Sequence, residues 1–496
     1  MLMYRRLLAA TAALALLSGA AHAQTAKSKP KADATLTAAQ KQGIKDYFAD
    51  NPVATAEALR DKALLDRTAW DITEDLTTTI GPRLVGSPAM ERAKDWGVAK
   101  LKALGFTDVK VEPFAKSSWT RGEESAELVG PYPMKLSIVG LGRTVPTPPE
   151  GIEADVALFR TYAEMIAAPE GALKGKIAVI TQPMVKAQDG SGYGVAGISR
   201  RSGPVEAAKR GAVALLIRSI STSDSTVPHT GVTAFGDGVA SIPSAAMGVP
   251  EAEQLERLAK EGKPLRIKLK LASTTDANDV AWNISGEIKG RKSRDEVIVI
   301  GGHLDSWDVG TGALDDATGI AITTAAAKLI GDLPKHPKRT IRVVMWGSEE
   351  SGGSSEAYIA AHKDEVAKIV LAGESDSGAD RIYALKLPAG AATHPFATTA
   401  ANVLAPLKIY VNRAPASHGG ADIEGLEQAG VPSIELEQDA SRYFDYHHTA
   451  DDTLNKVRPD ELAQNVAAWV SLIYLVAETG VDFRAIKAAA PATAAH

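Results

Sequence analysis

The chain has 496 residues, of which 45% are hydrophobic and 23% are charged, and its formal net charge is −5. This composition excludes a disordered, collagen-like or coiled-coil protein over most of the length, and it leaves no basic excess for binding nucleic acid. The sequence contains no cysteine, which excludes disulfides, thiolate metal sites and cysteine nucleophiles, so any metal must be bound by His, Asp and Glu.

The first residues have the pattern of an export signal. Arg5 and Arg6 precede the apolar run 7–17 (LLAATAALALL), and Ala21-His22-Ala23 fits a small-x-small cleavage site. A helix over this run would be about 16 Å long, too short for a bilayer core of about 30 Å, although an N-terminal anchor is the alternative. We predict a signal peptide at 1–23, a flexible tail at 24–37, and a periplasmic or secreted protein with no membrane association after cleavage.

The pattern then changes twice before the middle of the chain. Apolar residues recur at helical spacing from 38 to 104, and a helix at 89–104 is predicted to end at Gly105. Residues 128–275 are different, because Pro and Gly cluster at 143–151 and short β-like runs follow. We predict strands there at 154–159, 176–181, 212–218 and 265–271, and therefore an inserted β-rich domain.

From Asn278 onward, strands and helices alternate. The expected strands are 296–300, 340–346, 369–372, 408–411 and 433–436, and the expected helices are 317–333, 356–368 and 459–478. This alternation is typical of an α/β fold in which a mostly parallel sheet is covered by helices on both faces. The low-complexity residues 487–496 are predicted to be a disordered tail.

Acidic residues and histidines follow these predicted strands. His303 and Asp305 come after the strand at 296–300, where open α/β sheets place their ligands, although a solvated loop histidine is the simpler alternative. Asp315 and Asp316 precede the helix at 317–333. One of them could cap that helix while the other binds a metal, and the spacing does not decide which.

Two further acidic segments and a pair of histidines extend this pattern. Glu349 and Glu350 follow the strand at 340–346, so that one could bind a metal and the other face a water as a base, unless they form only an acidic helix start. The remaining candidates are Glu374, Asp376, His447 and His448. Histidines and carboxylates without thiolates suit a pair of zinc ions that share a carboxylate and a water.

In this order, the motifs HLDS, GALDDATG, EE, ESD and HTADDT resemble those of the co-catalytic di-zinc exopeptidases of the aminopeptidase-Y and bacterial leucyl aminopeptidase type. The resemblance is dense over 278–457, and the insert resembles a protease-associated domain. It implies a three-layer α/β/α zinc-peptidase fold with a mostly parallel sheet. The catalytic domain would comprise 38–127 and 276–486, with the protease-associated insert at 128–275.

The resemblance also implies roles for single residues. Two zinc ions would be bound by His303, Asp315, Glu350, Asp376 and His448, with Asp315 bridging the ions. Glu349 would be the general base, Asp305 would orient His303, and the bond between Asp315 and Asp316 would be cis. His447, Asp422 and His418 are candidate substrate contacts, although 417–422 could equally be a structural turn.

The function predicted from this resemblance is an exported exopeptidase that hydrolyses dipeptides or short peptides with a free N-terminus. Aminopeptidase, dipeptidase and carboxypeptidase action all stay open, as does a homodimer. The alternatives are a receptor-like protein of the same fold without catalysis, and a di-zinc enzyme that acts on non-peptide amides or cyclises glutaminyl termini.

Overall fold

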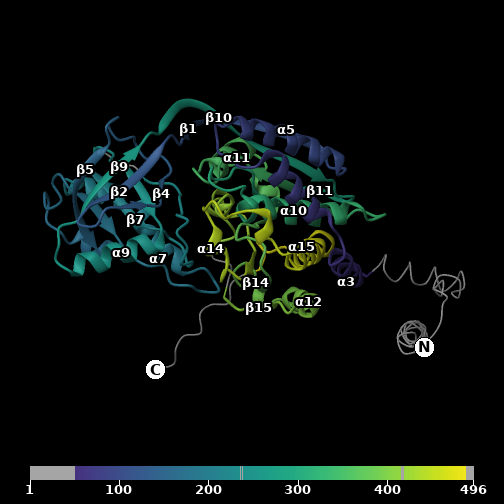
Figure 1. Ribbon diagram of the computed structural model, residues 1–496. Helices are drawn as coiled ribbons and strands as arrows, with labels where there is room; N and C mark the ends of the chain where they lie inside the picture. The colour runs from purple at the N-terminus through teal and green to yellow at the C-terminus, as the bar shows by residue number, and fades with distance from the viewer. Residues whose placement is uncertain (1–50, 235, 237, 415–417, 487–496) are drawn as a thin grey trace, which may run out of the picture. The chain divides into compact units, whose positions relative to one another are not determined.

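The computed structural model describes residues 51–234, 236, 238–414 and 418–486. The predicted signal peptide and the predicted tails at 24–37 and 487–496 lie outside these residues. The described residues from Pro52 onward belong to one compact unit, which Figure 1 shows. No helix in the described ranges is long and apolar enough to cross a membrane.

The main sheet has five strands in the order β1-β10-β12-β11-β13. The strands are β1 (Thr107–Thr120), β10 (Thr274–Ile288), β11 (Ser293–His303), β12 (Arg339–Trp346) and β13 (Ile369–Glu374). β11 is parallel to β12 and β13, but β10 is antiparallel to both β1 and β12. The sheet is therefore mixed, and the prediction of a mostly parallel sheet is wrong. The reason is that the chain leaves the main sheet along β1 and returns to it along β10 after residues 124–271. These two strands pair antiparallel and lie side by side in Figure 1.

Helices cover both faces of the main sheet. On β11, Ile298 and Ile300 belong to a hydrophobic cluster with α10 and α15, whereas Val297 and Val299 belong to another cluster with Tyr358 of α11. Because successive strand residues point to opposite faces, these helices form two outer layers. The helices of this region are α3 (Pro52–Ala63), α4 (Thr68–Asp75), α5 (Pro88–Ala103), α10 (Thr318–Gly331), α11 (Ser354–His362), α12 (Pro395–Leu404), α13 (Glu424–Gln428), α14 (Tyr443–Tyr446) and α15 (Pro459–Thr479).

A small sheet extends the main one. It contains β14 (Ile382–Lys386), β15 (Tyr410–Asn412) and β16 (Glu435–Gln438) in the order β15-β14-β16. An isolated parallel bridge between Ala372 of β13 and Ser433 joins the two sheets. Together, the two sheets and their helices are called the main region below, and they comprise the described residues up to 120 and from 274 onward.

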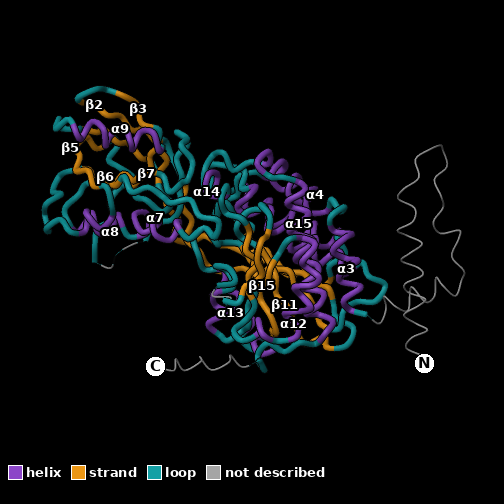
Figure 2. The backbone as a smooth tube through the Cα atoms, turned by 90° about the horizontal axis from the view of Figure 1, so that it is seen from below, coloured by secondary structure: helices purple, strands orange, loops and turns teal. Residues whose placement is uncertain are grey.

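Residues 124–271, called the insert region, form a second mixed sheet with its own hydrophobic core. Its eight strands have the order β3-β2-β9-β5-β6-β7-β8-β4. They are β2 (Glu124–Gly130), β3 (Met134–Leu136), β4 (Ile138–Gly140), β5 (Ile152–Phe159), β6 (Ile177–Ile180), β7 (Ala214–Arg218), β8 (Ser244–Met247) and β9 (Arg266–Leu271). The helices are α6 (Tyr162–Ile166), α7 (Gly192–Arg201), α8 (Gly203–Lys209) and α9 (Val249–Lys260). Figure 2 shows the strands of the insert region and of the main region in orange.

A half-buried arginine links the insert region to the main region. Arg121 follows β1 and donates from Nε and Nη2 to the carboxylate of Asp308, at 2.8 and 2.9 Å. Its Nη1 donates to the carbonyl of Gly140 in the insert region at 2.6 Å. This fork holds the loop after β11 against the insert region, which matters because that loop carries predicted site residues.

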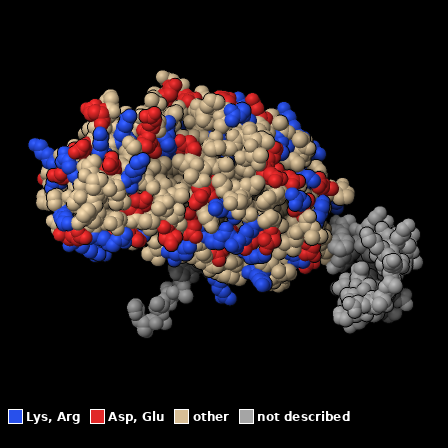
Figure 3. Space-filling view, viewed as in Figure 1, with Lys and Arg blue, Asp and Glu red and all other residues tan. Residues whose placement is uncertain are grey.

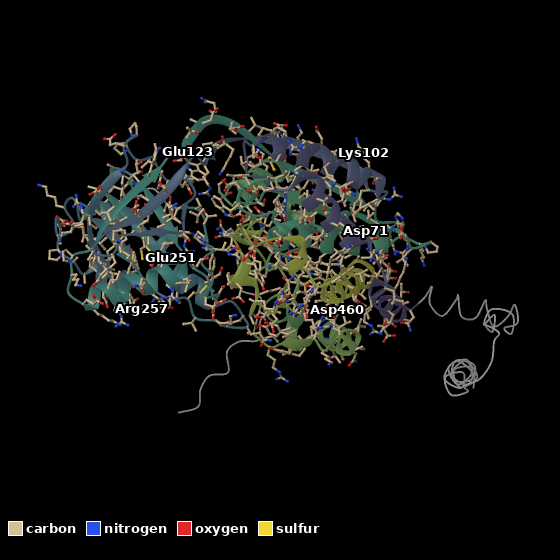
Figure 4. The ribbon with its side chains drawn as sticks, in the orientation of Figure 1. Asp71, Lys102, Glu123, Glu251, Arg257 and Asp460 are labelled. Carbon is tan, nitrogen blue, oxygen red and sulfur yellow. The ribbon has the colours of Figure 1, made fainter. Side chains whose placement is uncertain are left out.

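The charged residues of both signs are interspersed over the face shown in Figure 3. Asp71 and Lys102 of the main region and Glu123 beside the insert region are exposed examples, and Figure 4 labels them. The charges of functional interest are instead buried, at the edge of the main sheet.

Candidate metal centre

The carboxyl ends of three parallel strands bring predicted residues to one edge of the main sheet. His303 ends β11 and pairs with Trp346, which ends β12. Gly301 pairs with Glu374, which ends β13. The segments that follow β12 and β13 at this edge carry three more predicted residues: Glu349, Glu350 and Asp376.

The two adjacent aspartates before α10 have different tasks, and the bond between them is cis, as the resemblance implied. The carboxylate of Asp316 accepts hydrogen bonds from the backbone of His303 at 2.9 Å and of Gly319 at 3.0 Å, so it joins β11 to the start of α10. The carboxylate of Asp315 faces histidines instead. Its Oδ1 lies 3.0 Å from His303 Nε2 and its Oδ2 lies 3.1 Å from His448 Nε2.

Asp452 fixes the backbone that carries Asp315. It is buried and accepts three backbone hydrogen bonds, from Ala313 at 3.1 Å, Leu314 at 2.7 Å and Asp315 at 3.2 Å. Burial and the nearby charge of Asp315 together raise the pKa of Asp452 to about 7, although the backbone donors oppose both effects. The main role of Asp452 is therefore to shape the loop.

Two groups of ligand-type side chains share Asp315. In one group, His303 Nε2 lies 3.0 Å from Asp315 Oδ1 and 3.5 Å from Asp376 Oδ1. In the other, His448 Nε2 lies 3.1 Å from Asp315 Oδ2 and 3.0 Å from Glu350 Oε2. Within each group the potential ligand atoms all lie within 4.8 Å of one another. Glu350 Oε1 is buried and has no hydrogen-bond partner among the described residues, which fits a carboxylate that faces a cation.

Asp305 contacts both His303 and the pair of glutamates. The ring Nδ1 of His303 lies 2.9 Å from the main-chain carbonyl oxygen of Asp305 and 3.6 Å from its carboxylate. The carboxylate accepts hydrogen bonds from the backbone of Glu349 at 2.9 Å and of Glu350 at 3.3 Å. Asp305 therefore orients the imidazole mainly through its backbone, and its side chain positions the two glutamates.

Glu349 lies beside the two groups and belongs to neither of them. Burial raises the pKa of Glu349 well above its usual value, and the charges of Asp376 and Glu350 add to the rise while His303 opposes it. A carboxyl group with a raised pKa is suited to taking up and releasing a proton near neutral pH.

Arg83 is a buried cation close to these acids that the motif analysis missed. It donates to main-chain carbonyls only, with Nη1 2.8 Å from Thr311 and Nη2 3.0 Å from Gly312, while Nε contacts Leu304. Its guanidinium thus holds the loop before Asp315, and its positive charge offsets part of the negative charge of the nearby aspartates. A single arginine after a helix carries no sequence signal of such a role.

The insert region contributes a histidine that was also missed. His229 is fully buried, and its Nε2 lies 3.2 Å from Nδ1 of His447. His447 Nε2 lies 3.5 Å from Asp315 Oδ2, so His447 stands between His229 and the shared carboxylate. Nothing near His229 in the sequence pointed to this contact, because 218 residues separate the two histidines.

The insert region also holds the backbone and ring of His448. Thr230 donates its backbone N–H to the carbonyl of His448 at 2.9 Å, and its own carbonyl lies 3.4 Å from His448 Nδ1. Arg200 donates to the same Thr230 carbonyl at 3.1 Å. When one ring nitrogen of a histidine binds a metal, a hydrogen bond at the other ring nitrogen fixes the orientation of the ring.

The two other predicted substrate contacts have different surroundings. Asp422 is buried, its backbone donates to Glu374 Oε2 at 2.9 Å, and its Oδ2 has no partner within the described residues. Asp422 and Glu349 line one cavity of about 220 Å³. The His418 side chain is 54% exposed and lies 3.7 Å from Glu427, so the structure brings Asp422 to the site and gives His418 a surface ion pair.

Comparison with known proteins gives sequence relatives over most of the chain. The family model described as peptidase family M28 matches residues 283–473. Carboxypeptidase Q of Homo sapiens is 38% identical over 405 residues, which cover 81% of this chain and 84% of the relative. Carboxypeptidase Q of Xenopus laevis is 38% identical over 401 residues, with the same coverage.

Solved structures agree with these relatives. The crystal structure of a peptidase M28 precursor from Shewanella amazonensis has a TM-score of 0.86 and 41% identity, and covers 88% of this chain and 99% of its own. A zinc aminopeptidase from Bacillus subtilis has a TM-score of 0.61 at 19% identity, covering 84% and 95%, and shares the fold. The predicted resemblance to the exopeptidases is confirmed, as is the prediction of a metallopeptidase. The longer strings GGHLDSWDVGTGALDD and YFDYHHTADDT also resemble carboxypeptidase Q, and this resemblance is confirmed by the relatives of that name. The chain belongs to peptidase family M28.

Proposed function

We propose that this protein is an exported exopeptidase that binds two zinc ions and hydrolyses dipeptides or short peptides with a free N-terminus. The observation that carries the proposal is the position of Asp315, whose two carboxylate oxygens face His303 and His448 separately. A carboxylate with this geometry is suited to bridge two cations.

The donor set fits zinc. Each site would be formed by one imidazole, the shared carboxylate and one further carboxylate, namely Asp376 or Glu350. Zinc accepts nitrogen and oxygen ligands, and three protein ligands leave a position for water or substrate. Two zinc ions bound here would supply Lewis acidity and lower the pKa of a water that they share.

Glu349 would act as the proton carrier. Its backbone is fixed by Asp305, its carboxyl group lies beside both candidate sites, and its raised pKa suits proton exchange. In the proposed reaction Glu349 accepts a proton from the water that attacks the scissile carbonyl. It then transfers that proton to the leaving amine, which restores the carboxylate.

A cavity beside Glu349 supports recognition of a free N-terminus. Asp422 and Glu356 line this cavity of about 220 Å³ together with Glu349, so it is acidic. Because Asp422 Oδ2 is buried without a partner among the described residues, an ammonium group there would supply the missing donor. His447 is proposed as a further contact, since it lies between Asp315 and His229.

The relatives support the peptide substrate and the metal. Two of them are named carboxypeptidase Q, and the Bacillus subtilis structure is named a zinc aminopeptidase. The apolar run 7–17 supports export, and the hydrophobic cluster that consists of insert residues alone supports a protease-associated domain at 128–275. We keep the remaining domain bounds, 38–127 and 276–486, as part of this proposal.

The test uses a free dipeptide and its N-acetylated form, assayed with metal-loaded and chelator-treated protein. We expect hydrolysis of the free dipeptide alone, its loss with chelator and its recovery with zinc. Glu349→Gln should lower kcat by at least about 10³-fold while the bound zinc stays near two per chain. Asp460→Asn, an exposed change on α15 that Figure 4 labels, is the control and should have full activity.

Two outcomes would contradict the proposal. Fully zinc-loaded protein that cleaves neither dipeptide would favour the non-peptide or the receptor-like alternative. Loss of zinc from Glu349→Gln would show that this residue is a ligand and that Glu350 needs a new role.

A further inference from the structure

The acidic cavity beside Glu349 is larger than the N-terminus of a peptide requires. Its volume is about 220 Å³, whereas an ammonium group at Asp422 would occupy only a small part of it. Glu356 and Glu424 also line the cavity, and none of its described lining residues is Lys, Arg or His. Carboxylates of four residues therefore surround a space in which the proposed function accounts for a single cation.

Two helices bring Glu356 and Glu424 to this cavity. Glu356 lies in the first turn of α11, and Glu424 is the first residue of α13. The backbone N–H of Gly425 donates to Ser355 Oγ at 2.9 Å, which joins the direct neighbours of the two glutamates. Because Ser355 and Gly425 line the cavity as well, this hydrogen bond fixes the wall that carries both carboxylates.

The four acidic residues differ in exposure. Asp422 is buried and Glu349 is half-buried, whereas Glu356 and Glu424 are exposed. We call Asp422 and Glu349 the inner end of the cavity, and Glu356 and Glu424 its mouth. Glu424 accepts a hydrogen bond from the neutral amide of Gln428 at 3.0 Å, a contact that leaves its negative charge in place.

The inner end favours a cationic ligand. Asp422 is only 3% exposed, and its Oδ2 has no hydrogen-bond partner within the described part of the chain. Burial raises the pKa of Asp422 well above its usual value, and the charges of Glu374 and Glu349 raise it further. Carboxylates that repel one another in this way are stabilised by cations placed among them. A ligand with one positive group for each end of the cavity fits this arrangement.

We propose that the mouth of the cavity binds the positively charged side chain of a lysine or arginine at the N-terminal position of the peptide, so that peptides beginning with a basic residue are the preferred substrates. This inference rests on the proposed function. The α-ammonium group and the scissile carbonyl share one Cα atom, so the ammonium stays beside Glu349 at the inner end. The ammonium group of a lysine side chain is carried on a four-carbon stem from the same Cα atom and reaches the more distant mouth.

The kinetic test compares two dipeptides that differ in the charge of one side chain. Norleucine has the carbon stem of lysine without the ammonium group, so Lys-Ala and norleucyl-Ala share both termini and the scissile bond. We expect the wild type to prefer Lys-Ala by only about tenfold in kcat/KM, because pairs with exposed carboxylates are individually weak. The preference should fall as the salt concentration rises from about 0.01 M to about 1 M, since salt screens exposed charges.

Two substitutions at the mouth test which carboxylates are responsible. Glu356→Gln and Glu424→Gln keep the size of each side chain and remove its charge. Each should lower the preference for Lys-Ala by about threefold, and the double variant should have almost no preference. Glu123→Gln, an exposed change beside the insert region that Figure 4 labels, is the matched control and should keep the full preference.

Three kinetic results would overturn the inference. Equal kcat/KM values for Lys-Ala and norleucyl-Ala in the wild type would show that the side-chain charge is not recognised. A full preference for Lys-Ala in the double variant would show that the lysine side chain binds outside this cavity. An equal loss for both dipeptides in each single variant would show that Glu356 and Glu424 only support the wall between α11 and α13.

A binding experiment distinguishes failure of this inference from failure of the proposed function, because it needs no hydrolysis. Lysine and norleucine are titrated by calorimetry into the zinc-loaded wild-type protein. We expect lysine to bind about tenfold more tightly, and the double change Glu356→Gln and Glu424→Gln to remove that difference. Equal affinities would refute the site for a basic side chain even if dipeptides are hydrolysed. A preference for lysine without hydrolysis of any dipeptide would support the site and contradict only the proposed function.

Discussion

The main region and the insert region contribute different chemistry to the same centre. All five proposed metal ligands and Glu349 come from the main region, mostly from segments that follow strands of its sheet. The insert region contributes neutral or cationic groups that touch these residues from outside: His229, Thr230 and Arg200. The main region thus holds the proposed metal ligands, and the insert region fixes the histidines around them.

This division has a measurable consequence. Substitutions in the main region should change how much metal the protein binds. Substitutions in the insert region should leave the metal in place and change the rate, because contacts beyond the ligands orient the imidazoles and do not bind the ions.

The largest effect is expected for Asp315→Ala. Its carboxylate faces both His303 and His448, so its loss removes a ligand from both proposed sites. We expect the zinc content to fall from about two per chain to well below one, and kcat/KM to fall by at least about 10³-fold. Metal analysis after dialysis and dipeptide kinetics measure the two quantities.

The control for this experiment is Asp332→Asn, which removes a carboxylate paired with Lys328 beyond the end of α10. It should keep both metal and activity. A zinc content near two per chain in Asp315→Ala would show that the two ions do not share this carboxylate.

A smaller effect is expected for His229→Phe in the insert region. Phenylalanine keeps a ring where His229 stacks on His448, with centroids 5.0 Å apart, but it removes the contact between His229 Nε2 and His447. We expect kcat/KM to fall by about 10- to 100-fold with zinc content unchanged. The exposed change His336→Phe is the control, and loss of zinc from His229→Phe would show that the insert region itself contributes a ligand.

The two regions also differ in how far the sequence predicts them. The proposed ligands belong to short motifs at predicted strand ends, so both the pattern and the family resemblance point to them. Strands such as β12 and helices such as α15 were predicted within a few residues, since apolar periodicity determines them locally. The antiparallel β10 was missed as a partner of β12, because strand pairing depends on contacts that are distant in the sequence.

The same reasoning explains which site residues were missed. Arg83 lies 221 residues from Leu304, and His229 lies 218 residues from His447, so neither contact leaves a local pattern. Asp316 is the opposite case. The sequence left open whether it caps α10 or faces the metal, and its hydrogen bonds from Gly319 and His303 show that it binds the backbone of the first turn of α10 and of β11.

The two regions also differ in how much an ion pair contributes to the stability of the protein. Arg342 in β12 is buried and donates to Glu287 at 2.8 Å and to Glu365 at 3.0 Å. Arg342→Met removes a cation that pairs with the buried carboxylate of Glu287. Because a buried charge that loses its partner is costly, we expect the free energy of unfolding to fall by about 3 kcal/mol. Denaturant unfolding of the zinc-loaded protein measures this change.

The matched substitution in the insert region is Arg266→Met. Arg266 forms exposed ion pairs with Glu153 at 2.8 Å and Asp155 at 2.9 Å on the surface of its sheet. Exposed pairs contribute little, so we expect the unfolding curve to be unchanged within error. Equal destabilisation by the two substitutions would mean that burial does not distinguish these pairs.

The smallest effect concerns Asp75 at the end of α4. Its carboxylate accepts hydrogen bonds from Trp96 at 2.9 Å and from Lys100 at 2.5 Å. Burial alone would raise the pKa of Asp75, but the hydrogen bonds from Lys100 and Trp96 lower it overall. A folded-state pKa below the unfolded value of about 3.9 stabilises the protein above that pH, and the contribution disappears as the pH falls through the folded-state pKa.

We therefore expect Asp75→Asn to lower the free energy of unfolding by about 0.5 kcal/mol at pH 7, since the pair is partly exposed and screened. The difference from the wild type should shrink below about pH 4, where Asp75 itself becomes protonated. Asp155→Asn in the insert region removes an exposed carboxylate and is the control. A difference for Asp75→Asn that grows as the pH falls would have the wrong sign and would show that burial, and not Lys100, dominates at this position.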